Sequence, residues 1–244
     1  MKILILAAGY GTRLYPLTLN APKPLLAVNK KPIIDYLLEK TEKISGITEV
    51  LVVTNEKFYS NFTKWSADKK YPLPITIVND TTTSPEDRLG AVGDIAFVLR
   101  KRAIKEDLMV LGGDNLFDYA LISYIRAAGQ NSPRVTIGLF DIKDPAQAKQ
   151  FGVVGLDENN KITSFEEKPQ QPKSSLIAMC LYYFPKESLG LFEKYLQTVK
   201  KTDTTGEYIK WIAQQEAVFG YKFSGKWYDI GSMESYTQAQ KDFS

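Results

Sequence analysis

Residues 3–14 read ILILAAGYGTRL, an apolar run that passes directly into a glycine-rich loop. A short continuous apolar run that ends in glycine is typical of a buried parallel strand. Glycine lets the backbone approach an anion closely, and successive amide N–H groups can then form a cradle for phosphate. The stretch therefore predicts a strand over Ile3–Ala8 and an anion-binding loop at Gly9–Arg13.

Two basic side chains follow this loop closely. Arg13 is placed to neutralise a triphosphate, and Lys23 lies between Pro22 and Pro24, which stiffen the backbone around it. Neither common phosphate motif is present. The third glycine of G-x-G-x-x-G would fall at Leu14, and the G-K-[ST] ending of a P-loop is absent.

Strand-like and helix-like segments alternate over residues 1–140. The expected strands are 3–8, 49–54, 75–78, 108–111 and 135–140, and the expected helices are 32–45, 57–65, 91–102 and 121–128. This alternation predicts an α/β fold with a doubly wound, mostly parallel, Rossmann-like sheet. Ligands of such sheets lie beyond the carboxyl ends of the strands, where the polar segments 9–13, 79–93 and 112–115 fall.

The pattern changes after about residue 145 and becomes richer in strands. We expect a hairpin over 152–166, a strand over 176–184, and two strands at 218–223 and 226–230 paired with each other. Helices are expected over 189–199, 206–215 and 232–240. The whole chain, 1–244, is interpreted as a single domain whose halves are 1–145 and 146–244.

Composition excludes several classes of function. The 31 basic and 28 acidic residues give a net charge of +3, too small to favour a nucleic acid or an acidic membrane as partner. The chain has no histidine, which excludes Ser-His-Asp chemistry, Cys-His chemistry and a histidine-ligated zinc. Its one cysteine, Cys180, favours a reducing compartment. No apolar run is long enough for a signal peptide or membrane span, so we expect a cytoplasmic protein.

Six short segments together carry a family resemblance. In chain order they are LAAGYGTRLYPLT at 6–18, PKPLL at 22–26, GGDN at 112–115, FGVV at 151–154, EEKP at 166–169 and WYDIG at 227–231. This pattern spans most of the chain and resembles the sugar-1-phosphate nucleotidyltransferases, which include the glucose-1-phosphate thymidylyl- and uridylyltransferases. The resemblance implies the nucleotidyltransferase type of the fold, with a β-rich, sugar-binding extension in the second half.

The resemblance also implies an activity and its residues. An NTP and a sugar 1-phosphate would react, with Mg²⁺ as cofactor, to give an NDP-sugar and pyrophosphate. The catalytic residues would be Arg13, Lys23 and Asp114, and the metal ligands Asp114 and Asp229, whose hard oxygens suit Mg²⁺. The nucleotide would contact Leu6, Ala8, Gly9, Gly11, Thr12, Arg13, Asn79 and Gly90. The sugar phosphate would contact Gly152, Glu167, Lys168 and Tyr182.

The expected base pocket departs from the family pattern. Asn79 stands where a glutamine is common, and residues 89–95 read LGAVGDI where the family often has a form such as L-G-T-A-G-A-L. Asp80, Arg88 and Asp94 add charges with no evident role. The resemblance favours dTTP or UTP as nucleotide and glucose 1-phosphate as sugar, but the base, including CTP, stays open.

Two alternative functions stay open at this point. One is a cytidylyltransferase acting on phosphocholine or another alcohol phosphate, and the other is a non-catalytic sugar-nucleotide sensor on the same fold. The chain ends at Ser244, soon after the last expected helix, so we expect neither an acetyltransferase half nor an added oligomerisation segment. Whether the protein forms a homo-oligomer is open.

Overall fold

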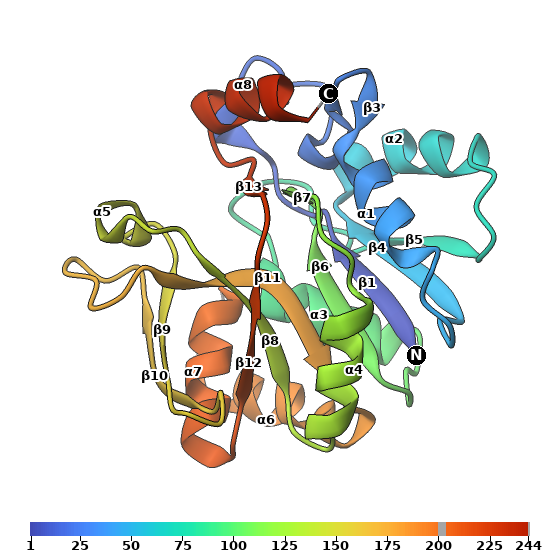
Figure 1. The fold of residues 1–244 in the computed structure, drawn as a ribbon. Coiled ribbons are helices and arrows are strands. Elements are labelled where there is room, and N and C mark those ends of the chain that lie inside the picture. The colour runs from blue at the N-terminus through green and yellow to red at the C-terminus, as the bar shows by residue number, and fades with distance from the viewer. Residues whose placement is uncertain (200–203, 244) are drawn as a thin grey trace.

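The structure, a computed structural model, describes residues 1–199 and 204–243. Within them, the central feature is a nine-stranded sheet with helices on both faces (Figure 1). Its core is a parallel arrangement in the order β6–β1–β4–β5. These strands are β1 (Lys2–Leu6), β4 (Glu49–Thr54), β5 (Ile75–Asn79) and β6 (Leu108–Gly112). All of β4 and β6 is buried, as a parallel strand covered on both faces requires.

Four helices of the first half cover the sheet, and the first three of them connect the strands of the parallel core. They are α1 (Ile33–Thr41), α2 (Glu56–Ala67), α3 (Gly90–Lys101) and α4 (Ile122–Asn131). In α2, the Asn55 side chain caps the first turn by accepting a hydrogen bond from the Phe58 amide. Phe58, Phe62 and Trp65 then form one buried stripe at helical spacing. The expected helix at 57–65 is therefore confirmed.

The second half extends the sheet with mainly antiparallel strands. β11 (Leu176–Phe184) is antiparallel to β6 on one side and to β8 (Thr136–Asp141) on the other. β9 (Gly152–Leu156) and β10 (Ile162–Glu167) form the expected hairpin. The helices here are α5 (Pro145–Ala148), α6 (Gly190–Thr198), α7 (Thr205–Gln215) and α8 (Met233–Asp242). The predicted fold class, with its β-rich extension, is confirmed.

The predicted hairpin of 218–223 with 226–230 is wrong. β12 (Phe219–Phe223) pairs in parallel with β8, whereas β13 (Trp227–Asp229) pairs in antiparallel fashion with β7 (Asn115–Phe117), a strand that we did not expect. Tertiary contacts outweigh the local turn. The Phe223 ring stacks on Tyr119 at 4.3 Å between centroids, and the Trp227 Nε1–H donates to Asn115 Oδ1 at 2.6 Å.

The last helix, α8, lies on the side of the molecule that carries a small two-stranded ribbon. Figure 1 shows α8 beside this ribbon, which is formed by β2 (Ala27–Val28) and β3 (Lys31–Pro32). The Tyr236 hydroxyl of α8 donates to the carbonyl of Ala27 at 2.7 Å. This contact fastens the last helix to the segment that follows Lys23.

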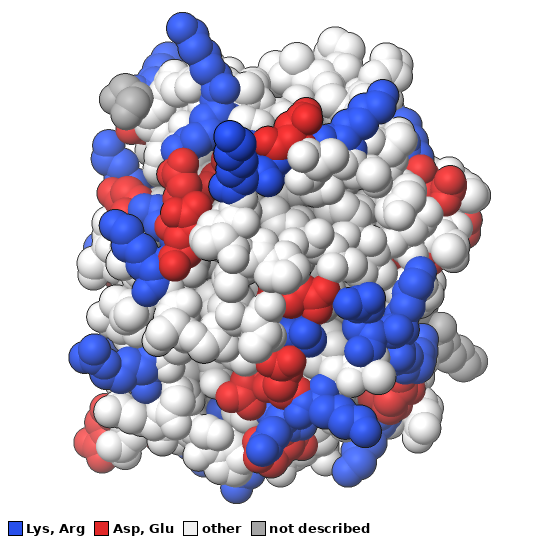
Figure 2. Space-filling model, turned by 90° about the vertical axis from the view of Figure 1, so that its right-hand side faces the viewer, with Lys and Arg blue, Asp and Glu red and all other residues white. Residues whose placement is uncertain are grey.

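The surface carries both signs of charge. On the face shown in Figure 2, Lys and Arg side chains alternate with Asp and Glu around a central area with few charges. This distribution agrees with the small net charge of +3. Among the described residues, no helix combines the length and the apolar character needed to cross a lipid bilayer.

Candidate active site

The β7–β13 ribbon brings together two aspartates that are far apart in the sequence. Asp229 on β13 lies opposite Asn115 on β7, and the Ile230 amide donates to the carbonyl of Asp114 at 3.0 Å. Asp114 also follows the end of β6, next to the central strand β1. Both carboxylates therefore lie at the carboxyl ends of the parallel strands, where such sheets bind ligands.

Lys23 pairs with the first of these aspartates. Its Nζ lies 2.7 Å from Asp114 Oδ2, and the lysine side chain is 15% exposed. Burial by itself raises the pKa of Asp114, but the Lys23 ammonium outweighs it and holds that pKa below the usual value. Burial and the Asp114 charge raise the pKa of Asp229. Asp114 is thus ionised and paired with Lys23. At Asp229, the surrounding positive charges do not offset the effects of burial and of the Asp114 charge on the pKa.

The two carboxylates are suited to a hard divalent cation. Nowhere in residues 1–199 and 204–243 do three or more His, Cys, Asp or Glu side chains gather as a metal site. A metal at Asp114 and Asp229 would therefore complete its coordination with water or substrate oxygens. This is the habit of Mg²⁺, which takes one or two carboxylates and keeps other positions for water and phosphate.

Two adjoining pockets connect the glycine-rich loop with this acidic pair. The larger, of about 220 Å³, is lined by the segment 9–14 together with Lys23, Pro85, Arg88 and Gly231. The smaller, of about 60 Å³, is lined by Leu6, Ala7, Gly9, Lys23, Pro24 and Asp114. Gly9 and Lys23 belong to both, so an anion in the loop would lie next to the Lys23–Asp114 pair.

The loop has the backbone geometry that its glycines suggested. Gly11 has φ 64° and ψ 24°, in the left-handed region, and its carbonyl accepts a hydrogen bond from Thr18 Oγ1 at 2.7 Å. Thr12–Leu14 then form a short 3₁₀ turn. A Cβ added to Gly231 would lie 3.2 Å from Asp229 Oδ2 and 3.6 Å from Arg13 Nη2, so both side chains approach Gly231. Arg13 thereby faces the same space as the two aspartates.

Residues of the second half border this space from the other side. Glu167, at the end of β10, lies so close to α7 that a Cβ added to Gly206 would be 1.9 Å from Glu167 Oε2. Burial raises the pKa of Glu167. The Lys168 Nζ lies 3.8 Å from Glu167 Oε1, and its charge also acts on Asp229. Lys168 is thus linked to Asp229 through its charge, and Glu167 is linked to Lys168 by the ion pair.

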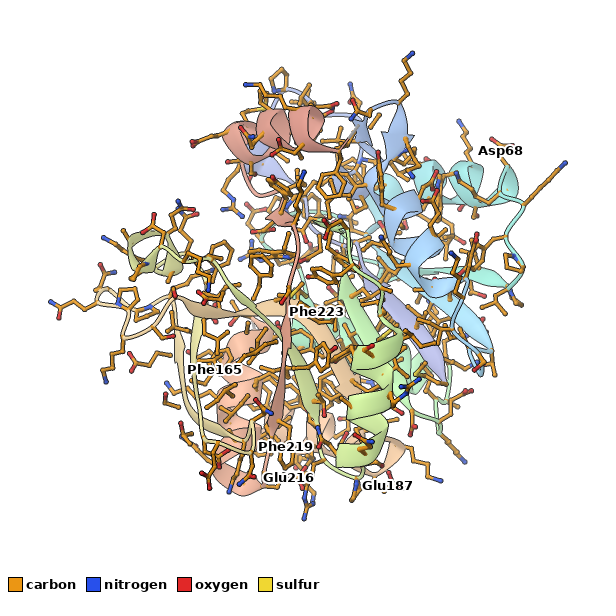
Figure 3. The ribbon with its side chains drawn as sticks, in the orientation of Figure 1. Asp68, Phe165, Glu187, Glu216, Phe219 and Phe223 are labelled. Carbon is orange, nitrogen blue, oxygen red and sulfur yellow. The ribbon has the colours of Figure 1, made fainter. Side chains whose placement is uncertain are left out.

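The aromatic ring of Phe165 packs against Gly152, one of the residues predicted to contact the sugar phosphate. A Cβ added to Gly152 would lie 2.4 Å from Phe165 Cζ and 3.2 Å from Glu167 Oε2. Phe165, labelled in Figure 3, comes from β10 and belongs to the buried cluster that also contains residues of α7. The absence of a side chain at Gly152 therefore lets the hairpin close onto this ring.

Eight predicted residues lie outside both pockets: Asp229, Gly152, Glu167 and Lys168, which are described above, and four more. The Tyr182 hydroxyl shares a hydrogen bond with Thr205 Oγ1 at 2.7 Å and is buried. The Asn79 amide donates to Glu56, and its Oδ1 accepts from the Thr81 amide at 2.7 Å. The remaining two are Ala8, whose carbonyl accepts a hydrogen bond from Asn55 Nδ2, and Gly90, which begins α3. Their roles in binding stay predictions.

Three further residues border the site without having been assigned to it. Pro85 and Arg88 line the larger pocket, although their loop carries no recognisable motif. Cys180 lies behind the acidic pair, where burial and then the charges of Asp114 and Asp229 raise the pKa of its thiol. The thiol is therefore held in its neutral, unreactive form. Only Arg88 had a sequence signal, as a charge of unexplained purpose.

Comparison with known proteins identifies the family. The family model for nucleotidyl transferases matches residues 2–244. A glucose-1-phosphate thymidylyltransferase from Neisseria meningitidis is 30% identical over 246 residues, which cover 98% of this chain and 81% of that protein. The bifunctional protein GlmU from Methanocaldococcus jannaschii is 29% identical over 246 residues, or 99% of this chain and 54% of GlmU. The chain thus spans about half the length of this archaeal relative.

Solved structures share the fold. A provisionally assigned glucose-1-phosphate thymidylyltransferase from Bacillus anthracis, crystallised with sucrose, superposes with a TM-score of 0.86 at 24% identity, covering 99% of this chain and 94% of that one. A UDP-glucose pyrophosphorylase in complex with UDP-glucose gives a TM-score of 0.82 at 21% identity, with coverage of 99% and 97%. The chain belongs to the nucleotidyl transferase family. The predicted resemblance is confirmed.

Proposed function

We propose that this protein transfers a nucleotidyl group from an NTP to a sugar 1-phosphate and releases pyrophosphate. The observation that carries the proposal is the position of the Lys23–Asp114 pair. Lys23 lines the pocket of the glycine-rich loop, and its partner Asp114 acts on Asp229, as does the charge of Lys168. The chain thus offers an anion cradle on one side of the two aspartates, and Lys168 beside the half-buried Glu167 on the other.

In the proposed reaction, a phosphate oxygen of the sugar 1-phosphate attacks the α-phosphorus of the NTP. A new P–O bond forms, the bond to the β-phosphate breaks, and pyrophosphate leaves with its electron pair. The attacking phosphate has a second pKa of about 6 and is already an anion near neutral pH. No general base is needed, in agreement with the absence of histidine from the sequence.

Catalysis would then consist of positioning and charge neutralisation. The amides of Gly9–Thr12 would hold the triphosphate, and Arg13 would neutralise the departing pyrophosphate. Lys23 would lie beside the attacked phosphate, because it borders both pockets. Asp114 and Asp229 would hold Mg²⁺, which lowers the charge of the triphosphate and orients it.

The second half would supply the sugar site. Lys168 would pair with the sugar phosphate, and Glu167 would accept hydrogen bonds from sugar hydroxyls. Gly152 would contact the sugar through its backbone, because the Phe165 ring fills the space that a side chain there would take. We accordingly treat 1–244 as one domain with a nucleotide-binding half, 1–145, and a sugar-binding half, 146–244. We favour dTTP or UTP, glucose 1-phosphate, and a cytoplasmic location.

A substrate matrix tests the proposal. Purified protein with Mg²⁺ is incubated with each of dTTP, UTP, CTP, ATP and GTP against several sugar 1-phosphates and phosphocholine, and pyrophosphate release is measured. We expect turnover with at least one sugar 1-phosphate and a clear preference for a pyrimidine nucleotide. Nucleotide binding without pyrophosphate release from any pair would reject catalysis and favour a sensor. Release only with phosphocholine would indicate a cytidylyltransferase for alcohol phosphates.

A further inference from the structure

Two buried carboxyl groups outside the proposed metal site face each other behind the nucleotide pocket. Asp80 directly follows β5, and Asp94 lies in α3; they are 2% and 6% exposed. The two side chains lie close enough for each carboxyl group to shift the pKa of the other. Asp80 Oδ2 and Asp94 Oδ1 receive no hydrogen bond from any N–H or O–H donor in the described parts of the chain.

A single proton held between the two carboxyl groups would satisfy both of these oxygens. Two carboxylates that face each other in a buried site cannot both be ionised, because each opposes the other's charge. A single proton between them makes one acid a donor and the other an acceptor, in a short, charge-assisted hydrogen bond. Burial and then the Asp80 charge raise the pKa of Asp94 to about 8, which marks Asp94 as the donor.

The acceptor of this pair anchors a loop. Asp80 Oδ1 accepts hydrogen bonds from the Thr82 amide at 2.8 Å and from Thr82 Oγ1 at 2.9 Å. The Thr82 carbonyl accepts in turn from the Glu56 amide at 3.0 Å, at the start of α2. Asp80 therefore links α3, through Asp94, with the first turn of the loop that spans residues 80–89.

This loop forms one wall of the larger pocket. Pro85 and Arg88 line that pocket opposite the glycine-rich loop, and Tyr10 lines it as well. The Tyr10 hydroxyl is buried beside Thr82 without a well-formed hydrogen bond to the described residues. The Asp80–Asp94 pair thus acts on the pocket through Thr82, which lies next to Tyr10.

We propose that Asp80 and Asp94 share one proton and that this acid pair positions the loop over residues 80–89 against the nucleotide pocket. Asp94 is a positioning residue, since it lines neither pocket. Asp87 of the same loop and Tyr10 of the glycine-rich loop are titratable groups that face the pair. The effect on nucleotide binding rests on the proposed function, whereas the shared proton and the loop anchor do not.

The first test measures stability against pH on the protein alone. In the wild type, the folded state retains a proton that the unfolded state releases. The contribution of the pair to the free energy of unfolding is therefore complete below about pH 4 and declines until the pH passes about 8. Asp94→Asn keeps a donor toward Asp80 but cannot release a proton. We expect its stability relative to the wild type to increase steadily from pH 5 to pH 8.

The matched control is Glu86→Gln, which removes one exposed carboxylate from the same loop. Its stability is expected to follow the wild-type pH profile in parallel. A parallel profile for Asp94→Asn would overturn the shared proton.

The second test measures the loop itself by amide hydrogen exchange. Asp94→Leu removes the donor and keeps the branched shape of the side chain, so the Thr82 amide is expected to exchange about tenfold faster than in the wild type, whereas Asp94→Asn leaves its rate within about twofold. Equal exchange in wild type and Asp94→Leu would overturn the positioning role. Should Asp94→Leu fail to fold, the same comparison is made on the wild type between pH 6 and pH 9, where faster Thr82 exchange beyond the chemical pH dependence is expected and is absent in Asp94→Asn.

The third test measures the dissociation constant of the nucleotide that the substrate matrix selects. Asp94→Leu is expected to weaken binding about tenfold and Asp94→Asn by less than about twofold. Unchanged affinity in Asp94→Leu, with a wild type that binds, would limit the pair to a structural role. A wild type that binds no nucleotide would contradict the proposed function, while the first two tests would still decide the acid pair.

Discussion

Lys23 donates to Asp114 across 91 positions of the chain, with 2.7 Å between Nζ and Oδ2. The Lys23 ammonium is bound to the same carboxylate that the proposed Mg²⁺ would contact. Burial and the Asp114 charge raise the pKa of Asp229, the second proposed metal ligand, on which the charge of Lys23 also acts. A cation and Lys23 must therefore share Asp114, and the affinity of the protein for a metal depends on how firmly Lys23 holds it.

Lys23→Met is expected to separate metal binding from catalysis. Removal of the competing ammonium leaves Asp114 available, so Mn²⁺ should bind the nucleotide-free protein about three- to tenfold more tightly. Turnover should nevertheless fall by roughly 10²–10³, because a positive charge beside the attacked phosphate is lost. Mn²⁺ binding by electron paramagnetic resonance and pyrophosphate release give the two measurements. The control Lys64→Met removes an exposed lysine on α2 and should change neither. Weaker Mn²⁺ binding in Lys23→Met would contradict competition for Asp114.

Asp114→Asn should reduce kcat by roughly 10²–10³ while the protein stays folded. The amide keeps the shape of the side chain but loses the charge that Lys23 and a metal need. Circular dichroism checks the fold, and pyrophosphate release at several Mg²⁺ concentrations checks activity. Asp68→Asn, at the exposed end of α2 labelled in Figure 3, changes the net charge equally without touching the site and should keep wild-type turnover. Near-wild-type activity of Asp114→Asn would reject the metal assignment.

The parallel core was predictable because its strands are buried on both faces. A continuous apolar run such as Ile3–Ala8 needs no partner in order to be recognised as a strand. β7 and β13 have three residues each, too few to show a period, and they are joined through Trp227 and Asn115 rather than through a local turn. The incorrect hairpin at 218–230 follows from this, since adjacent strands were assumed to pair with each other.

The candidate site also has a part that the sequence predicts and a part that it does not. Gly9–Arg13 and Lys23 could be predicted from local sequence, because glycines, prolines and basic side chains have direct consequences for the backbone or the charge. The meeting of Asp114 with Asp229 depended on the family resemblance. The departure from the family pattern singled out Asp80 and Asp94 as charges of unexplained purpose, but not their partnership, because an acid inside a helical segment is indistinguishable from a solvated one until its burial is known.

Gly206→Ala should act on the sugar phosphate and spare the nucleotide. The added Cβ would lie 1.9 Å from Glu167 Oε2, so the Glu167 side chain must move away from its position beside Lys168. We expect the KM for the sugar 1-phosphate to rise about tenfold and the KM for the NTP to change by less than about twofold. Gly190→Ala, at the start of α6, has no atom within 4 Å of the added Cβ and serves as control. An equal rise in both KM values would place Glu167 outside a dedicated sugar site.

Gly11→Ala and Gly129→Ala should change stability in opposite directions, although the same methyl group is added. Gly11 has φ 64°, where alanine costs about 1–2 kcal/mol, and the added Cβ would lie 3.0 Å from Thr18 Cγ2. Gly129 lies inside α4 with open space around it, so alanine there should stabilise the protein by about 0.5–1 kcal/mol. Urea unfolding measures both changes.

If the loop binds phosphate through its backbone, Gly11→Ala should also weaken NTP binding, because relieving the strain rotates the amides of Gly11 and Thr12 out of the cradle. Weakened binding in Gly129→Ala as well would show that the loss is not specific to the loop, whereas a loss confined to Gly11→Ala assigns the anion site to the loop.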